Sequence, residues 1–268
     1  MIPRLAVLMA VRDAERWVAH AVDSTLRALP ADSEIVAIDD GSRDGTGRIL
    51  AGFADPRLLV VHQPPSGLAA SLNRAIRLTR APVIARMDAD DVALPGRFWR
   101  PLAVLAARHE VGLVGGWALE IDRTGRVLRR REPPGDDAGL RRALWRGNPF
   151  VHSTVTVRRS VLEAVGGYDE SFPVAQDYAL WVRMARVTTL ATVPEVLVLR
   201  RLLPGQASGR DRDRFKAELR VKSSALRSGE VSPWAAVYLA KPLAGLALPD
   251  SIRRGMRRAL GSVLSPCP

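Results

Sequence analysis

The 268-residue chain has one cysteine, three lysines and no long apolar run. Because Cys267 is alone, neither a disulfide framework nor a cysteine-based zinc site can form within one chain, which fits a reducing cytoplasm. The apolar run at residues 5–11 is too short to span a bilayer, and Arg12 ends it. It therefore indicates a first buried strand rather than a signal peptide. No internal repeat or low-complexity segment is present.

Arginine supplies nearly all of the positive charge, and the formal net charge is +12. A basic chain can bind nucleic acid, an anionic membrane or phosphorylated substrates. Arginine is scattered over most of the sequence, however, so a general bias toward arginine explains much of the positive charge equally well. No aromatic-interleaved basic patch or known recognition motif is present, and we expect no nucleic-acid partner. Only the C-terminal third concentrates its charge.

Apolar residues make up 47% of the sequence, enough for one large α/β domain, alone or with a small appendage. The first half alternates strand and helix patterns, with strands expected at 5–11, 34–38, 57–62 and 82–87 and helices at 15–29, 44–54, 67–79 and 97–109. This order predicts a mostly parallel, doubly wound sheet flanked by helices. Ligands bind at the carboxyl ends of the strands in such sheets.

The second half is less regular. We expect a hairpin of strands 112–121 and 127–131, helices at 136–145, 160–165 and 175–186, and strands at 151–157 and 193–201. From residue 211 onward the pattern is helical, basic and amphipathic, which predicts a helical C-terminal appendage.

The motif Asp88-Ala89-Asp90-Asp91 follows an expected strand. Three carboxylates so close together repel one another unless a cation or water screens them. On a tight turn they suit Mg²⁺ or Mn²⁺, which prefer oxygen ligands and also hold substrate phosphates. A solvated acidic turn before a helix N-terminus explains the same residues about as well.

Two further groups share this sheet edge. The run 39–46 begins with Asp39, whose carboxylate can accept hydrogen bonds from a base or ribose, although a helix cap at Ser42 or Asp44 is the plainer alternative. Arg12 and Asp13 follow the first strand; Arg12 can stack on a nucleobase, meet a phosphate, or form an ordinary loop ion pair.

Two candidates lie in the second half. Asp177 opens an apolar helix and can act as a general base, but an acid in a first helical turn is favoured in any case. His152 precedes an expected strand and is a secondary candidate, because a lone histidine is more often structural than catalytic.

In this order, the segments resemble the family 2 glycosyltransferases, which have the GT-A fold. The match covers residues 5 to about 208 and depends on segments 7–15, 39–46, 67–73, 86–91, 166–169 and 176–178. The resemblance implies a catalytic domain at 1–208, with a nucleotide-binding half (1–110) and an acceptor half (111–208), followed by the basic amphipathic segment 209–268.

The resemblance also implies an activity. An inverting enzyme of this kind moves a sugar from a nucleotide-diphosphate sugar, typically a UDP-sugar, to a hydroxyl of a saccharide or lipid-linked acceptor in cell-envelope polysaccharide assembly. A divalent metal, Mn²⁺ or Mg²⁺, stabilises the charge on the leaving diphosphate, and a carboxylate takes the acceptor's proton.

The implied residue roles follow the matching motifs. Asp39 would contact the nucleobase, Asp88 and Asp90 would hold ribose and metal, and Asp177 would be the base. The donor site would also include Val11, Arg12, Asp13, Asn73, Arg86 and Ala89, and the acceptor side would include Gly166, Gly167, Tyr168, Gln176, His152 and Trp181.

The chain departs from the family pattern at three places. Arg12 replaces the usual stacking aromatic residue, although an arginine plane can also stack. Gln176 replaces the usual Glu beside Asp177, which removes a negative neighbour and would lower the pKa of Asp177. The run 200–205 has no histidine where the family often has Tyr-Arg-x-His, so metal binding would be weaker, or another group or water would fill the place.

The C-terminal segment has an apolar stretch at 234–248, interrupted by Lys241-Pro242, and a cationic amphipathic stretch at 252–260. Such a helix can lie in a membrane interface, so we expect a cytoplasmic protein with peripheral contact to the anionic inner face of the cytoplasmic membrane. Packing onto the catalytic domain, or a dimer contact, is the alternative.

Two other functions remain open. A nucleotidyltransferase would usually have a glycine-rich, basic phosphate loop after the first strand, which residues 11–15 lack. A degenerate nucleotide-binding scaffold without turnover is favoured by Gln176 and the missing histidine, but Asp88, Asp90 and Asp177 oppose it.

Overall fold

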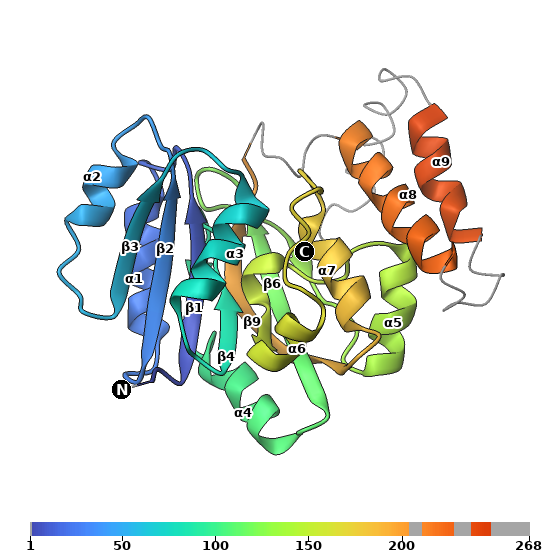
Figure 1. The fold of residues 1–268 in the computed structure, drawn as a ribbon, viewed down its shortest axis with the longest axis horizontal. Helices are drawn as coiled ribbons and strands as arrows, with labels where there is room; N and C mark the ends of the chain where they lie inside the picture. The colour runs from blue at the N-terminus through green and yellow to red at the C-terminus, as the bar shows by residue number, and fades with distance from the viewer. Residues whose placement is uncertain (1, 204–210, 228–236, 248–268) are drawn as a thin grey trace. The chain divides into compact units, whose positions relative to one another are not determined.

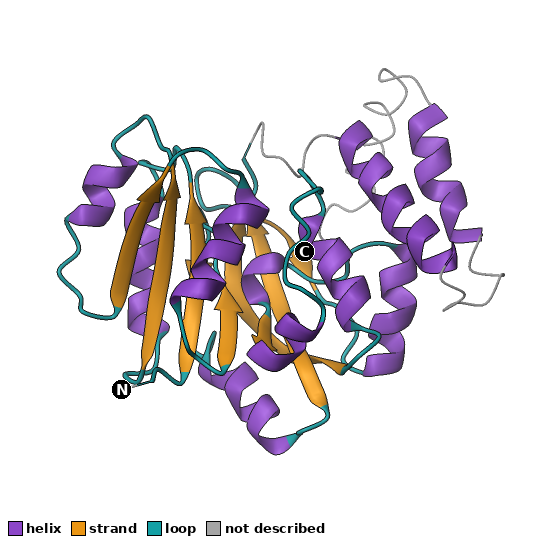
Figure 2. Cartoon of the chain, in the orientation of Figure 1, coloured by secondary structure: helices purple, strands orange, loops and turns teal. Residues whose placement is uncertain are grey.

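The computed structural model describes residues 2–203, 211–227 and 237–247 (Figures 1 and 2). Contacts between residues divide the chain into two units, 1–203 and 204–268. The boundary at 208 that the sequence suggests falls outside the described residues and stays a prediction.

The first unit is built on a nine-stranded sheet in the order β3-β2-β1-β4-β8-β6-β9-β5, with β7 paired to β6. Strands β1 to β4 run parallel, as do β6 and β9, whereas β5, β7 and β8 pair antiparallel with their neighbours. This confirms the predicted mostly parallel α/β sheet. The strands are β1 Leu5–Val11, β2 Ser33–Asp40, β3 Leu58–Gln63, β4 Val83–Arg86, β5 Val92–Ala93, β6 Val111–Ile121, β7 Val127–Arg131, β8 Thr156–Arg158 and β9 Thr189–Arg201.

Helices cover both faces of the sheet (Figure 1). Side chains of α1 and α4 join alternate residues of β1, including Leu5 and Met9, in one buried cluster, while α3 packs on β1 and β2 from the opposite face. Because β1 is covered on both sides, all of its residues but one are buried and its sequence is almost uniformly apolar. The helices of this unit are α1 Val18–Ala28, α2 Thr46–Ala51, α3 Leu68–Leu78, α4 Trp99–Ala107, α5 Asp137–Arg146, α6 Arg159–Ala164 and α7 Gln176–Met184.

The strand order places a crevice beside β1. The chain proceeds from β1 to β2 and β3 on one side, and then crosses back to β4 on the other side of β1. At such a reversal the connections leave the sheet in opposite directions, which opens a ligand-binding crevice at the carboxyl ends of the two strands. Arg12 and Asp13 follow β1 at this edge, and Asp88 follows β4.

Two expectations need correction. Asp39 and Asp40 do not follow β2 but form its last two residues, paired with His62 and Gln63 of β3. The strand expected over 151–157 is wrong for most of its length. His152–Thr154 form a short 3₁₀ helix, because the backbone N–H and the hydroxyl of Thr154 both donate to the carbonyl of Val151, at 2.9 and 2.8 Å.

Arg97 ties the end of β4 to the segment around this 3₁₀ helix. Its guanidinium is fully buried and donates to the carbonyls of Ser153 at 2.7 Å, Val155 at 2.8 Å and Arg86 at 3.0 Å, and to the hydroxyl of Thr156 at 3.0 Å. Burial lowers the pKa of Arg97 to about 9, so the group is still charged at neutral pH. The buried cation thus fixes residues 153–156 relative to the strand that leads into the acidic turn.

In the second unit, the described residues form helices α8 Asp211–Arg227 and α9 Ala240–Ala247, as the helical pattern predicts. Lys222, only 1% exposed, donates from Nζ to Glu218 Oε1 at 2.5 Å and to the carbonyl of Tyr238 at 3.2 Å. Among the described residues, none of the helices has the length and apolar character needed to cross a bilayer. The predicted amphipathic stretch at 252–260 lies outside the described residues.

Candidate active site

Asp39 is held by protein partners at the end of β2. Its Oδ1 accepts hydrogen bonds from the N–H of Ser42 at 3.1 Å and the hydroxyl of Ser42 at 2.5 Å, and its Oδ2 lies 2.9 Å from His62 Nδ1. Asp39 is 5% exposed, whereas the His62 side chain is 58% exposed. The sequence analysis missed His62, because only the pairing of β3 with β2 places it beside Asp39.

The turn after β1 is joined to the turn after β2. Asp13 has a φ of +48°, which a non-glycine residue adopts at a cost, and strain of this kind is often found at functional sites. Its N–H donates to the hydroxyl of Ser42 at 3.0 Å, and its carboxylate accepts from the N–H of Arg43 at 2.8 Å. The half-exposed Arg12 side chain lies 3.8 Å from Asp13 Oδ2, the ordinary loop ion pair that the sequence analysis left open.

Asp88 begins the acidic turn and is fixed by two neighbours. The guanidinium of the buried Arg86 donates to its Oδ1, and the hydroxyl of Ser153 donates to its Oδ2 at 2.9 Å. Burial opposes ionisation of this carboxylate, but the charge of Arg86, with a smaller contribution from the hydrogen bond of Ser153, holds the pKa of Asp88 below its ordinary value. Asp88 is therefore an oriented, ionised carboxylate at neutral pH.

Asp91 has a different environment, although it lies in the same turn. Asp91 is 2% exposed. Its Oδ2 lies 2.5 Å from the hydroxyl oxygen of Ser153, and its Oδ1 accepts a hydrogen bond from the N–H of Arg201 at 2.8 Å. Burial, with the charges of Asp88 and Asp90, raises the pKa of Asp91 well above its ordinary value. Asp91 thus joins the turn to the end of β9, and its raised pKa relieves the repulsion among the three carboxylates.

The acidic turn offers few protein ligands for a metal. Within residues 2–203 and the described parts of the second unit, no group of three or more His, Cys, Asp or Glu side chains is placed to hold an ion. Asp88 and Asp90 are both partly exposed oxygen donors, as hard divalent cations require. Mg²⁺ commonly takes one or two protein carboxylates and completes its shell with substrate phosphates and water. The two carboxylates fit a metal of that kind, with most of its ligands supplied by the substrate and water.

Asp177 is the second residue of α7. The helix starts after Ala175, whose φ of +59° turns the chain sharply. Asn148 Nδ2 donates to Asp177 Oδ2 at 2.7 Å, and the N–H of Tyr178 donates to Oδ1 at 2.8 Å. Burial is the largest influence and raises the pKa of Asp177 above its ordinary value; the effect expected from Gln176 in place of a Glu stays a prediction.

The charge of the acidic turn also affects Asp177. Asp88, far away in the sequence, contributes to the raised pKa of Asp177. The contacts of the 3₁₀ helix agree with this. Ser153 binds Asp88, and the adjacent His152 packs edge-on against Trp181 of α7, so the end of β4 and α7 lie in one region of the fold. Asn148 and Ser153, which orient these two carboxylates, were not among the predicted site residues, because only tertiary contact reveals their partners.

The predicted acceptor-side residues His152, Tyr168 and Trp181 lie together. His152 Nε2 is 2.8 Å from the hydroxyl of Tyr168, and its ring meets that of Trp181 edge-on, with centroids 5.8 Å apart. Burial, and then the charge of Arg86, lowers the pKa of His152 well below its ordinary value, so the imidazole is neutral. These three side chains therefore form a buried, uncharged cluster on the side of the 3₁₀ helix near Asp88.

Asn73 holds the glycine-rich loop that carries Tyr168. Its Oδ1 accepts from the N–H of Tyr168 at 2.9 Å, and its Nδ2 donates to the carbonyl of the same residue at 2.8 Å. Gly167 has a φ of +70°, and a Cβ there would lie 2.9 Å from Asn73 Oδ1, so both the conformation and the space require glycine. The structure thus shows that Asn73 positions the loop at Tyr168. Its contact with the nucleotide-sugar donor stays a prediction.

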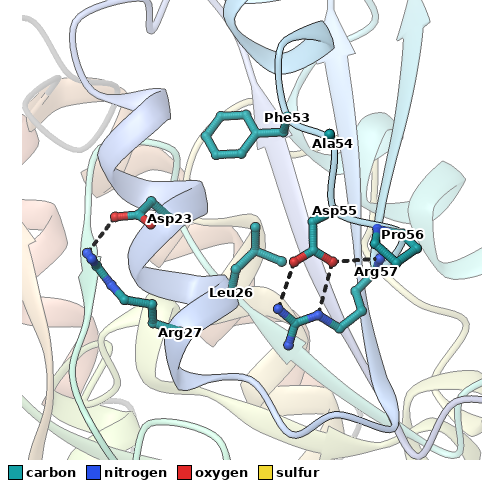
Figure 3. A pocket seen from close by; sticks show the side chains of 8 residues that line it. All are labelled: Asp23, Leu26, Arg27, Phe53, Ala54, Asp55, Pro56 and Arg57. Atoms are coloured by element: carbon teal, nitrogen blue, oxygen red, sulfur yellow. Dashed lines mark hydrogen bonds and ion pairs between the residues drawn. The ribbon is translucent and has the colours of Figure 1, made fainter.

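A pocket elsewhere in the first unit takes no part in this arrangement (Figure 3). Its volume is about 430 Å³, and it lies between α1 and the amino end of β3, lined by Asp23, Leu26, Arg27, Phe53, Ala54, Asp55, Pro56 and Arg57. The charged groups there pair locally, Asp23 with Arg27 at 2.5 Å and Asp55 with Arg57 at 2.8 Å. The predicted donor residues lie instead at the carboxyl ends of β1, β2 and β4.

Solved structures share this fold. A structure of TarS from S. aureus in complex with UDP-GlcNAc superposes with a TM-score of 0.73, at 15% identity, covering 90% of this chain and 72% of that one. The mannosyltransferase PcManGT from Pyrobaculum calidifontis, in complex with GDP-Man and Mn²⁺, gives a TM-score of 0.66 at 20% identity, covering 97% and 81%. The first unit accordingly has the GT-A arrangement of sheet and helices.

Sequence comparison finds glycosyltransferases as well. The putative glycosyltransferase EpsE of Bacillus subtilis is 30% identical over 68% of this chain and 66% of its own length. The amylovoran biosynthesis glycosyltransferase AmsE of Erwinia amylovora is 28% identical over 64% and 65%. The chain thus spans slightly less than two thirds of the length of these relatives.

The family model described as glycosyl transferase family 2 matches residues 6–166, which include every predicted donor-site residue. The chain belongs to glycosyl transferase family 2.

Proposed function

We propose that this chain transfers a sugar, with inversion, from a nucleotide-diphosphate sugar to a hydroxyl of a saccharide or lipid-linked acceptor. The observation that carries the proposal is the link that His152 and Ser153 make between α7, which carries Asp177, and the acidic turn that follows β4. A base and a donor-binding turn at one site are what group transfer to a hydroxyl requires. We take a UDP-sugar as the first donor to test, because of the family resemblance and the UDP-GlcNAc bound to TarS.

The donor would lie along the carboxyl ends of β2, β1 and β4. Asp39 and Arg12 are placed toward the nucleobase in this proposal, and Asp88 and Asp90 toward the ribose and diphosphate. Mn²⁺ or Mg²⁺ held by Asp90 and Asp88 would supply Lewis-acid stabilisation of charge on the leaving diphosphate. Arg86 keeps Asp88 ionised and oriented for this role.

Asp177 would accept the proton of the acceptor hydroxyl while the new bond to the anomeric carbon forms. Asn148 and the N–H of Tyr178 each hold one of its oxygens, which fixes the carboxylate, and each oxygen has further lone-pair capacity for a substrate hydroxyl. A raised pKa makes a carboxylate a stronger base than an ordinary aspartate. The neutral His152 would lie on the acceptor side, whereas Trp181, only 1% exposed, would support the His152 ring from behind and not contact the acceptor.

The metal-assisted donor site can be tested by thermal unfolding. UDP or GDP with Mn²⁺, at about 100 times the dissociation constant, should stabilise the wild type by roughly 2.7 kcal/mol, and Asp90→Ala should lose most of this gain. Asp23→Ala is the control, because that carboxylate pairs with Arg27 in the remote pocket. If no nucleoside diphosphate stabilised the wild type, the scaffold without turnover would be the better description.

The assignment of the base predicts a selective loss of turnover. Asp177→Asn keeps the size of the side chain but removes its basicity, so the release of nucleoside diphosphate from UDP- and GDP-sugars should fall about 1000-fold. Nucleotide binding should remain within a few-fold of the wild type. Asp55→Asn, in the remote pocket, should retain full turnover. Near-normal activity of Asp177→Asn would remove Asp177 from this role.

The raised pKa of Asp177 predicts the pH dependence. The base works only when ionised, so kcat/KM should fall as pH drops through this pKa, at a higher pH than for an ordinary aspartate. The hydrogen bond from Asn148 favours the ionised form, and Asn148→Ala should move this acidic limb to still higher pH. An unchanged limb in the variant would mean that another group sets it.

We further propose that the chain works in the cytoplasm and contacts the anionic inner face of the membrane. In the second unit, α8 exposes Arg212, Lys216 and Arg220 at four-residue spacing, a cationic stripe along one helix face. The chain should sediment with phosphatidylglycerol vesicles but not with phosphatidylcholine vesicles. Changing all three residues to Gln should reduce the fraction that sediments with phosphatidylglycerol. Equal sedimentation with both lipids would contradict an electrostatic contact.

A further inference from the structure

The hairpin formed by β6 and β7 carries a cationic surface. Residues 123–131, from its turn to the end of β7, include five arginines and no acid. Arg129 and Arg130 each pair with a nearby glutamate. Arg123 and Arg126 are exposed, and neither forms an ion pair with an acid in the parts of the chain that the structure describes. These two arginines are therefore available to an anionic partner.

Two apolar side chains are exposed on the same strand. Val127 and Leu128 are 52% and 48% exposed. Ile121 of β6 is paired with Val127, and Glu120 with Arg129, so Leu128 is an extra residue in β7, a β-bulge that interrupts the alternation of side chains. Exposed apolar groups on an edge strand favour contact with another surface, whereas charged groups there oppose pairing with a second sheet. The combination favours a partner that accepts both apolar groups and cations.

A buried side chain ties the start of the hairpin turn to the acidic turn. Arg201 donates from Nη1 to the carbonyl of Asp122 and from Nε to the carbonyl of Asp90, both at 3.1 Å. Only 7% of Arg201 is exposed. Because β6 and β4 both pair antiparallel with β8, they run in the same direction, and their carboxyl ends reach the same edge of the sheet. The hairpin turn therefore lies at the edge that carries the proposed site.

An anionic lipid surface matches this set of groups. Arginines close to such a surface are attracted by its negative lipids, and apolar side chains among them can enter the boundary between headgroups and acyl chains. A soluble polyanion would also attract the arginines. Because it offers no apolar phase, however, it would leave Val127 and Leu128 in water. The exposed apolar pair therefore favours the membrane over a soluble polyanion.

We infer that the β6–β7 hairpin docks the first unit on an anionic membrane, with Arg123 and Arg126 at the headgroups and Val127 and Leu128 entering the interface. The inference rests on the proposed membrane contact and adds a surface in the first unit to the stripe on α8. Since Arg201 ties the hairpin to the acidic turn, docking there holds the proposed site beside the membrane, where a lipid-linked acceptor is found.

Binding of the full chain to mixed phosphatidylglycerol and phosphatidylcholine vesicles at low salt tests the charges. Arg123→Gln combined with Arg126→Gln should weaken partitioning about tenfold, because both arginines lose their attraction to the anionic lipid. Arg77→Gln combined with Arg80→Gln is the matched control and should change it little. Those exposed arginines flank the exposed Leu78 at the end of α3, where the chain returns to the amino end of β4, at the opposite edge of the sheet.

A second measurement follows the apolar residue itself. In a Cys267→Ser background, a polarity-sensitive fluorophore attached to Leu128→Cys should shift its emission to shorter wavelength on phosphatidylglycerol vesicles, because the label enters the interface. The same label on Leu78→Cys should keep its emission wavelength. Far-ultraviolet circular dichroism and the unfolding temperature confirm that each variant is folded before its binding is compared.

The outcomes separate this inference from the proposed function. Equal partitioning of the hairpin and control variants would overturn the docking role of the hairpin, as would an unshifted label at residue 128 on vesicle-bound protein. If only the change of the α8 stripe reduced binding, the membrane contact would stand without the hairpin. A dimer of the wild type that is lost in Leu128→Ser would assign the surface to a second copy instead. A wild type that binds no vesicles would overturn both membrane proposals, while turnover would still decide sugar transfer.

Discussion

The architecture of the site depends on keeping three carboxylates together in one turn, of which Asp91 is buried and Asp88 and Asp90 are partly exposed. Like charges at this separation destabilise a fold unless each has a partner. One hydroxyl, that of Ser153, contacts both Asp88 and Asp91, so the position of residue 153 determines the geometry of the turn. That position depends in turn on the fully buried cation Arg97, whose guanidinium donates a hydrogen bond to the carbonyl of Ser153.

Burial gives neighbouring aspartates different chemistry. Asp88 has a guanidinium beside it and keeps its charge, whereas Asp91, three residues away, has a strongly raised pKa and serves to hold β9. The pKa of Asp177 is raised as well, but its side chain remains partly exposed and is accessible to a substrate. The same side-chain type thus provides an oriented anion, a strand anchor and the base that we propose, and the difference lies in partners and solvent access.

Contacts between the two halves of the first unit make the site one structure. Asn73 of α3 holds the loop at Tyr168, and Ser153 holds the turn after β4. Asp91 receives the end of β9. Since each contact joins residues 1–110 to residues 111–203, a shift in one half would displace the proposed base relative to the proposed donor site. A reaction between two bound partners depends on this kind of fixed geometry.

The sequence by itself determined the parallel core, the carboxyl edge that carries the site and the family, because apolar periodicity and the acidic and glycine motifs are local features of the chain. Asp39, Asp88, Asp90 and Asp177 could all be selected on that basis. Only the tertiary structure decided the environment of each carboxylate, since burial and hydrogen-bond partners come from segments distant in the chain. The strand predicted around His152 failed for the same reason that Ser153 and Asn148 were missed. Their positions follow from packing between segments, and no local pattern records which distant group a side chain will meet.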